Sequence, residues 1–422
     1  MLPYASDLKL TKNPVVTYAM MAVFALLWAW SFYLEKTEGM GRVNLLFFQL
    51  GITPGHFHPL TLLTYMFLHA SWVHLLVNLF YLWVFGAGVE EAVGRGKFLL
   101  LFIASGVLGG MLQAIVTIAM LPLASQQMPI VGASAACAGL MGIFAVRYYR
   151  AKLAFVGLPF RPQVVAVVGV FLSIEILLGL YFLATNAAEG GVAHWAHVGG
   201  FVFGLAFAQF TKLGDIGELA YLNQDATQAM AQSIPGAAIK KWELLMAKDP
   251  TKANVRVELA RAWLLLGDLE HASQRYLEAV QLYLSQNLRA EAAQLYVEIR
   301  SGDQDVQGTL EKSEFRASVS AILVKLTPTQ LFQLANALEE RNDHANAAEL
   351  FRAVTVSAPA SSEAETAQLK AITLYIRHLG RKSEADILIR LFLDRYPHSP
   401  FRALAEDLKK EAKGQKVEIV EK

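Results

Sequence analysis

Six long apolar stretches fill the first half of the chain and constrain its fold more than any other feature. Crossing the hydrocarbon core of a bilayer takes a helix of roughly 18 or more apolar residues, since each residue advances the helix by about 1.5 Å. Lipid offers the backbone no hydrogen-bond partner, so each stretch is expected to be helical. The predicted spans are Pro14–Leu34, Leu68–Gly88, Phe98–Met120, Gly132–Tyr149, Val164–Ala184 and Trp195–Thr211.

Charge divides the chain into two unlike halves. Residues 1–212 hold 11 Lys and Arg and 7 Asp and Glu, whereas residues 213–422 hold 26 and 29. The first half therefore has the composition of a membrane domain and the second that of a soluble domain. A net charge of +1 gives no indication of nucleic-acid binding. The single cysteine, Cys137, excludes an intrachain disulfide and a cysteine-based zinc site.

The loops between the predicted spans indicate an orientation. Loops rich in Lys and Arg stay in the cytoplasm. The loop between the third and fourth spans has no charged residue, and the loop between the fifth and sixth has only Glu189. We therefore expect a multi-pass protein of the inner or plasma membrane with both termini in the cytoplasm. The basic residues between the fourth and fifth spans are Arg147, Arg150, Lys152 and Arg161.

Four polar residues stand near the same end of three predicted spans. Polar groups inside a membrane are costly, so each is a candidate for function. His74 and Asn78 are spaced i, i+4 and share one helix face. Ser134 and His197 each lie in the first turn of a span that enters from the same side. A histidine can take the serine proton, and further donors can stabilise an oxyanion, so this set suits acyl transfer.

Small residues surround the serine and follow the histidine. Gly132 comes two positions before Ser134, and Gly200 and Gly204 form a GxxxG pattern one turn after His197. Small residues let membrane helices approach each other closely. The sixth span is therefore expected to pack tightly on the fourth, bringing imidazole to hydroxyl.

Three motifs resemble those of the rhomboid intramembrane serine proteases. They are His69-x4-His74-x3-Asn78, Gly132-x-Ser134, and Ala196-His197-x-x-Gly200-x-x-x-Gly204. The resemblance covers roughly residues 10–212, where the order of the motifs along the spans also agrees.

The resemblance implies a serine endopeptidase that cleaves transmembrane protein substrates near the outer face of the membrane. Ser134 would be the nucleophile and His197 the general base, with no third acidic member. His74, Asn78 and the Ser134 backbone N–H would form the oxyanion hole. His69 would hold the outer loop, and neither a metal nor another cofactor is implied.

Departures from the family pattern leave two other functions open, a rhomboid-like pseudoprotease and a membrane-anchored scaffold. Ala135 replaces a glycine, and its methyl is expected to narrow the approach to the nucleophile. Ala138 stands where many members have an aromatic residue on the histidine, so the imidazole must be oriented by other groups. Glu175, in the fifth span, is expected to face the bundle interior and bond a neighbouring helix.

The second half shows a recurrent helical pattern that resembles tetratricopeptide-like repeats. Turn residues Asn342 and Gly380 lie 38 positions apart, and Gly267 precedes Asn342 by 75, about two periods. Repeats of this kind form surfaces that bind peptides or proteins, here a cytoplasmic partner, and the alternative is a plain stabilising bundle. The predicted fold is all-α, a six-transmembrane-helix bundle followed by helical repeats. The predicted parts are a membrane domain at 1–212, a linker at 213–236, repeats at 237–408 with a degenerate copy at 283–325, and a charged tail at 409–422.

Overall fold

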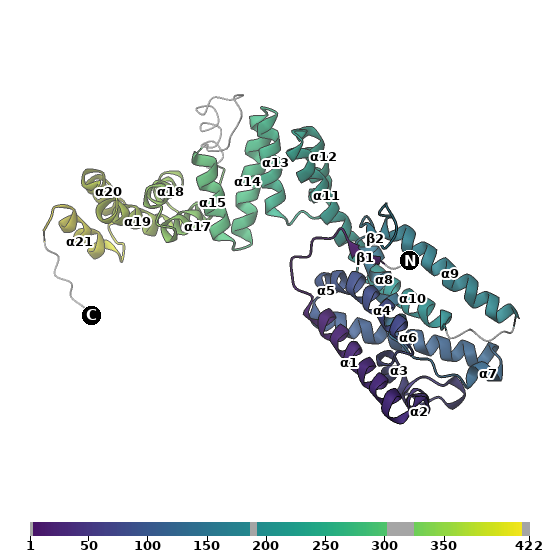
Figure 1. Cartoon of the computed structure of the whole chain (residues 1–422). Helices are drawn as coiled ribbons and strands as arrows, with labels where there is room; N and C mark the ends of the chain where they lie inside the picture. Colours follow the sequence, from purple (N-terminus) through teal and green to yellow (C-terminus); the bar gives the residue numbers. More distant parts are fainter. Residues whose placement is uncertain (1–2, 186–191, 302–324, 416–422) are drawn as a thin grey trace. The chain divides into compact units, whose positions relative to one another are not determined.

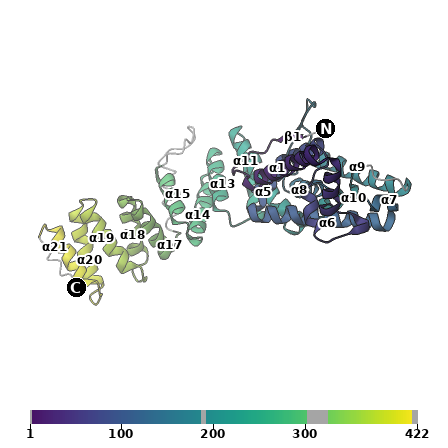
Figure 2. The same ribbon diagram turned by 60° about the horizontal axis from the view of Figure 1, so that its bottom comes forward.

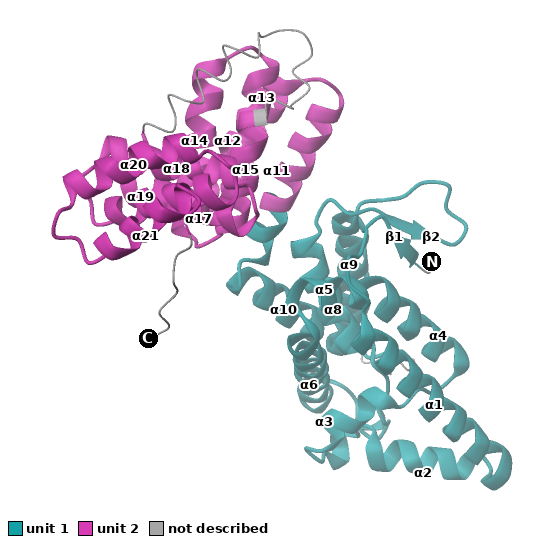
Figure 3. Cartoon of the chain, turned by 90° about the vertical axis from the view of Figure 1, so that its left-hand side faces the viewer, with its two compact units in different colours: residues 1–218 teal, residues 219–422 magenta. Residues whose placement is uncertain are grey.

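The computed structural model describes residues 3–185, 192–301 and 325–415. The chain forms two compact units, Met1–Glu218 and Leu219–Lys422, which Figure 3 distinguishes by colour. Both units are helical, so the all-α prediction is confirmed. In the described residues the β-structure amounts to one two-stranded sheet and two isolated bridges.

The first unit is a helical bundle whose long helices follow the predicted spans (Figure 1). Its major elements are β1 (Pro3–Ser6), α1 (Val15–Glu38), α2 (Met40–Leu50), α4 (Trp72–Tyr81), a π-helical turn (Leu82–Gly86), α5 (Ala87–Val93), α6 (Arg95–Met120), α8 (Ser134–Arg147), β2 (Leu153–Phe155), α9 (Val164–Thr185) and α10 (His194–Phe210). Its short helical segments are Pro54–His56, α3 (Thr61–Thr64), Tyr65–Phe67 and α7 (Leu123–Gln126).

Four helices among the described residues are long and apolar enough to cross a membrane, and the chain is a multi-pass membrane protein. They are α1, the continuous helix Trp72–Val93, α6 and α9. The other two predicted spans coincide with α8 and α10, which have 14 and 17 residues. Since about 20 residues cross the hydrocarbon core, neither spans it by length alone, and the count of six crossings stays a prediction.

Helix α8 is the centre of this bundle, and glycines bring its backbone against its neighbours. Every residue from Ala135 to Phe144 is buried. On α10, a Cβ added to Gly200 would lie 2.0 Å from the Ala135 carbonyl oxygen, and one added to Gly204 would lie 2.0 Å from the Gly139 oxygen. No larger residue fits at either position, so α8 and α10 meet at backbone distance.

The small sheet and α2 were not predicted from the sequence. Strands β1 and β2 pair antiparallel, with Pro3 opposite Phe155, so the start of the chain is bound to the segment before α9. Both strands are too short for a clear alternation of apolar and polar residues. Helix α2 follows α1 directly after Gly39, whose φ of +85° allows the sharp change of direction.

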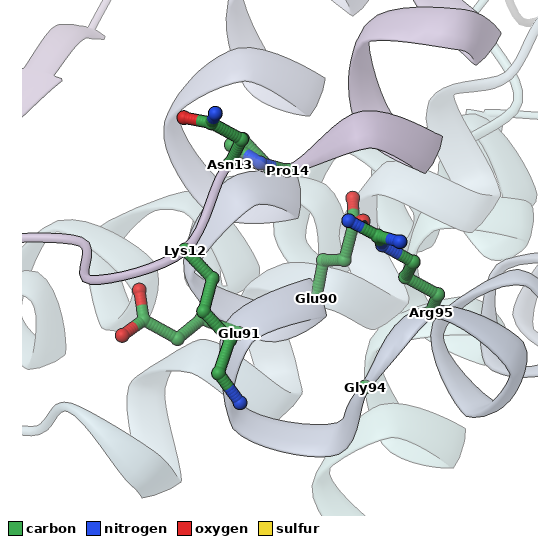
Figure 4. A pocket seen from close by; sticks show the side chains of 7 residues that line it. All are labelled: Lys12, Asn13, Pro14, Glu90, Glu91, Gly94 and Arg95. Atoms are coloured by element: carbon green, nitrogen blue, oxygen red, sulfur yellow. Dashed lines mark ion pairs between the residues drawn. The ribbon is translucent and has the colours of Figure 1, made fainter.

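The N-terminus of α1 receives its cap from another helix. Pro14 offers no capping side chain, but Glu90 of α5 accepts hydrogen bonds from the backbone N–H groups of Val16 and Thr17, at 3.0 and 2.8 Å. Its negative charge also suits the positive end of the helix dipole. Pro14 and Glu90 border a pocket shown in Figure 4, where Arg95 lies near Glu90, 3.9 Å from its carboxylate. The buried carboxylate Glu90 is thus assigned to holding α1 on α5.

The second unit is a series of helical hairpins that follow one another in chain order in Figures 1 and 2. Positive φ angles at Gly267, Asn342 and Gly380 mark the predicted hairpin turns. Asp268 caps the next helix by accepting from His271 N, and this bond lowers the pKa of the Asp268 carboxyl. The helices are α12 (Pro235–Lys248), α13 (Ala253–Leu265), α14 (Leu269–Ser285), α15 (Arg289–Ser301), α17 (Pro328–Glu340), α18 (His344–Ser357), α19 (Ala364–Arg377), α20 (Lys382–Arg395) and α21 (Arg402–Ala412).

The segment expected to be a linker, 213–236, differs from that expectation because most of it is the helix α11 (Leu213–Ala231). Leu222 and Ala226 are buried in a cluster with Trp242 of α12, whose indole N–H donates to Asn223 at 3.0 Å. A sparse apolar pattern hid this helix, which becomes stable by packing on α12. Of the degenerate copy at 283–325, residues 302–324 lie outside the described residues, as do Glu189 and residues 416–422 of the charged tail.

We expect Gly204→Ala to destabilise the first unit by roughly 1–3 kcal/mol or more, because the new methyl would overlap the Gly139 carbonyl oxygen. Thermal unfolding in detergent measures this as a lower Tm. Gly169→Ala in α9, where an added Cβ meets nothing within 4 Å, is the matched control and should leave the Tm unchanged or slightly higher. Equal Tm values for the two variants would contradict backbone-distance packing of α8 on α10.

Candidate active site

Ser134 and His197 lie in direct contact although 63 residues separate them. Ser134 begins α8 and His197 lies in the first turn of α10, with Ser134 Oγ 2.8 Å from His197 Nε2. Both residues are half-buried. The close approach of α10 to α8 at Gly200 allows these two short side chains to meet. The geometry permits a proton to pass from the hydroxyl to the imidazole.

Gly132 brings the irregular segment before α8 close to His74. Its φ of +122° is disfavoured for other residues, and a Cβ added there would lie 2.6 Å from His74 Nε2. The same Cβ would lie 3.8 Å from Asn78 Nδ2. His74 and Asn78, both on α4, therefore face the segment that leads into Ser134.

Asn78 offers a buried hydrogen-bond donor at this position. Its residue exposure is 2%, and Nδ2 has no hydrogen-bond partner among the described residues. Leaving such a donor unpaired costs roughly 1–3 kcal/mol, which is typical of a group that awaits a ligand or reaction intermediate. Helix α8 packs against α4 here, since the Cys137 thiol lies 3.8 Å from the Asn78 carbonyl oxygen and donates to it.

His69 lies beside these residues. Its ring is buried, with its centroid 5.3 Å from that of His74 and 5.5 Å from that of Phe24 on α1. The ring contacts thus join α1, the loop before α4, and α4 itself. This position suits the expected role of His69 in holding the loop.

Glu175 of α9 lies in the candidate site, although the sequence did not identify it as a site residue. Its Oε2 accepts a hydrogen bond from His194 Nδ1 at 2.7 Å, so the expected bond to a neighbouring helix is confirmed. The same oxygen lies 2.9 Å from His197 Nδ1, a close ion-pair contact in which Nδ1 forms no hydrogen bond to a described residue. An acidic side chain therefore lies beside the histidine, where the resemblance implied a catalytic set with no third acidic member. The sequence did show a single carboxylate in an otherwise apolar helix. It could not show which residue this carboxylate contacts, because that depends on how α9 packs on α10.

Two further expectations about the histidine and the nucleophile are resolved by packing. Phe171 lies one turn before Glu175, and its ring centroid is 6.0 Å from that of His197, so α9 provides the aromatic neighbour that Ala138 does not. The Ala135 methyl is buried and points toward Gly109 of α6, 2.9 Å from a Cβ added there. The expectation that it narrows the approach to Ser134 is therefore wrong.

Within the described residues, no group of three or more His, Cys, Asp and Glu side chains is placed to hold a metal ion. The 2.8 Å contact between Ser134 Oγ and His197 Nε2 suggests the chemistry of a serine with an imidazole base.

Comparison with known proteins agrees with this geometry. The family model described as the rhomboid domain matches residues 56–212, which include all three motifs. This chain carries a rhomboid domain. The matched residues lie within the first unit. They include α4, α8, α9 and α10, the helices that supply the residues of the candidate site.

The relatives that match this chain include bacterial and plant proteins. The putative rhomboid protease YdcA of Bacillus subtilis is 32% identical over 131 residues, which are 31% of this chain and 61% of that protein. The rhomboid protease GluP of the same organism is 31% identical over 162 residues, 37% of this chain and 27% of the relative. RHOMBOID-like protein 6 of Arabidopsis thaliana, a mitochondrial protein, is 30% identical over 152 residues, 34% of this chain and 40% of the relative.

These matches span less than two thirds of each relative. Among solved structures, a crystal structure of a TPR domain is 14% identical and covers 78% of both chains, at a TM-score of 0.18. A TM-score this low does not indicate a shared fold. The helical hairpins of the second unit are instead evident from its own helices and turns.

We expect Gly132→Ala to slow the labelling of Ser134 by a fluorophosphonate probe by about 100-fold, since a displacement of the site by about 1 Å has this scale of effect. The methyl would meet His74 Nε2 and require a strained φ. Gly157→Ala is the control, because Gly157 also has a positive φ but an open neighbourhood. Equal slowing of both variants would show that backbone strain alone is responsible and contradict the role of the His74 contact.

Proposed function

We propose that the first unit is a serine endopeptidase that cleaves transmembrane protein substrates within the membrane. The observation that carries this proposal is the 2.8 Å contact between Ser134 Oγ and His197 Nε2 inside a rhomboid domain. The relatives named as rhomboid proteases support the same activity. A pseudoprotease would have no need of a hydroxyl and an imidazole held at this distance.

In the proposed acylation, the Ser134 hydroxyl attacks the scissile carbonyl carbon while its proton passes to His197 Nε2. The carbonyl electron pair moves to the oxygen, which becomes an oxyanion. When the C–N bond breaks, His197 returns the proton to the leaving amine, and the acyl group remains as an ester on Ser134. Water then attacks this ester with His197 again as the base, releasing the acid and restoring the hydroxyl.

Asn78 and His74 are proposed to stabilise the oxyanion together with the Ser134 backbone N–H. The unpaired Nδ2 of Asn78 and the approach of Gly132 to His74 support this role. Donors that are already in place act without reorganisation when the charge develops, and one such donor contributes about 10²–10³-fold to kcat. His69 would support His74 through the ring contact.

We further propose an inner or plasma membrane location with both termini in the cytoplasm. The basic loop between α8 and α9 supports this orientation by the positive-inside rule. Ser134 and His197 both lie at helix starts that would then face the outer side. The reaction would occur near the outer face, where water can reach the ester.

Ser134→Ala and His197→Ala are each expected to reduce cleavage of a transmembrane substrate by at least about 1000-fold without unfolding the protein. Because the two groups act as a unit, the double variant should be hardly slower than either single variant. Purified protein in detergent, a labelled substrate and gel analysis of the products provide the measurement. Cys137→Ala should remain active, since the thiol is a buried packing group one turn away. Substantial cleavage by Ser134→Ala would reject the serine mechanism.

The second unit is proposed to bind a cytoplasmic protein or peptide. Stacked hairpins present an extended surface, and recruitment of a client's cytoplasmic tail raises the client's concentration near the protease site. No residue of this unit enters the proposed chemistry. Its role would be to select or regulate clients.

Removal of residues 232–422, which keeps α11 entire, should leave cleavage of a short transmembrane substrate intact. Cleavage of clients with long cytoplasmic tails should fall, by up to about 100-fold if the tail provides avidity. Rates for both substrate classes, compared with the full chain, test this division. A folded truncation that cleaves neither substrate would contradict it. Digestion of the repeats by a protease added outside sealed cells would contradict their cytoplasmic location.

A further inference from the structure

Glu175 is the one acidic or basic residue of α9, a helix otherwise suited to lipid. A carboxylate placed in hydrocarbon is costly unless polar partners surround it, so its position calls for a physical explanation. Glu175 is 8% exposed and turned toward α10 rather than toward the lipid side.

Three groups form a continuous line from Glu175 to the serine. Glu175 Oε2 is 2.9 Å from His197 Nδ1, and His197 Nε2 is 2.8 Å from Ser134 Oγ. The carboxylate thus lies beside one nitrogen of the imidazole and the hydroxyl beside the other. A neutral imidazole has one N–H donor and one bare nitrogen.

We propose that Glu175 is a positioning residue that converts the Ser134–His197 pair into a Ser134–His197–Glu175 triad. This inference rests on the proposed function and adds a third group to it. An acceptor beside Nδ1 keeps the proton on that nitrogen and leaves Nε2 free to accept the serine proton. After that transfer, the imidazolium is paired with the carboxylate, which stays ionised throughout.

His194 holds the carboxylate in place. It donates Nδ1–H to the same Oε2 at 2.7 Å, and its ring is buried and stacked on Phe182, with centroids 5.6 Å apart. One oxygen therefore faces two imidazole nitrogens, one on each side. Phe171, one turn before Glu175, limits the rotation of the His197 ring.

The close contact at His197 Nδ1, which is not yet a hydrogen bond, agrees with a role in the transition state. His197 is neutral before the reaction, and attraction to Glu175 increases only when it becomes an imidazolium. Hydrogen bonds of this kind are often misaligned in the free enzyme and tighten on the reaction path. A group that stabilises the charged stage more strongly than the neutral one affects kcat more than KM.

A structural alternative is that Glu175 only fastens α9 to α10 through His194. That role predicts a loss of stability, with kcat unchanged for the protein that remains folded. The positioning role predicts a loss of kcat at nearly constant KM and a change in the His197 proton. The two roles therefore separate in measurement.

Kinetics of the full chain provide the first test. Glu175→Gln keeps size and polarity but removes the charge, and kcat is expected to fall by about 100-fold or more with KM within about twofold. Glu175→Asp retains the charge on a shorter side chain and should recover part of the rate. Ser173→Ala, on the exposed side of the same helix, is the matched control and should match the unaltered protein. A stable Glu175→Gln protein with the kcat of the control would overturn the proposal.

Nitrogen-15 NMR of histidine-labelled protein provides a test that does not depend on cleavage. The His197 signals, assigned by their loss in His197→Ala, should report a proton on Nδ1 in the unaltered protein and a mixture of tautomers in Glu175→Gln. If the unaltered protein shows this pattern but cleaves no substrate, the proposed function fails while the positioning by Glu175 stands. A proton on Nε2 in the unaltered protein overturns the positioning whatever the cleavage assay gives.

Discussion

The backbone contact between α8 and α10 is the constraint on which the rest of the first unit depends. Gly200 and Gly204 place α10 against the carbonyl oxygens of Ala135 and Gly139, where an added Cβ would be only 2.0 Å away. Helices separated by larger side chains would hold their residues several ångströms further apart, and Ser134 would no longer reach His197. In lipid, close packing of this kind replaces the hydrophobic drive that assembles helices in water. The same contact thus stabilises the bundle and sets the distance of the candidate site.

The two buried carboxylates among the described residues of this bundle, Glu90 and Glu175, both lie against N–H donors of other segments. Glu90 caps α1, and Glu175 is shared by two imidazoles, so each carboxylate receives N–H donors that water would otherwise supply. Asn78 Nδ2 differs, since it is buried with no partner among the described residues. Burial without a partner is costly, and this cost is consistent with a donor kept for a reaction intermediate.

The two units are stabilised by different physics. Glycine contacts and apolar helices hold the first, whereas alanine, leucine and aromatic side chains form a continuous buried cluster along the hairpins of the second. Trp242 and Tyr276 are among the largest fully buried side chains of the second unit. Each hairpin gains stability by burying apolar surface against the next, which explains why a segment with little apolar pattern, α11, is helical beside α12.

The sequence by itself determined the all-α class, the separation into membrane and soluble parts, and the hairpin turns at Gly267, Asn342 and Gly380. These features follow from local composition, because apolar length selects a membrane helix and a positive φ favours Gly or Asn. The motifs also identified Ser134, His197, His74 and Asn78 as candidates. Only the tertiary structure decided that Glu175 and Phe171 lie beside His197, that the Ala135 methyl is buried against α6, and that Leu213–Ala231 is helical. Those outcomes depend on the rotation and approach of one helix against another, which arises from side-chain packing between segments far apart in the chain.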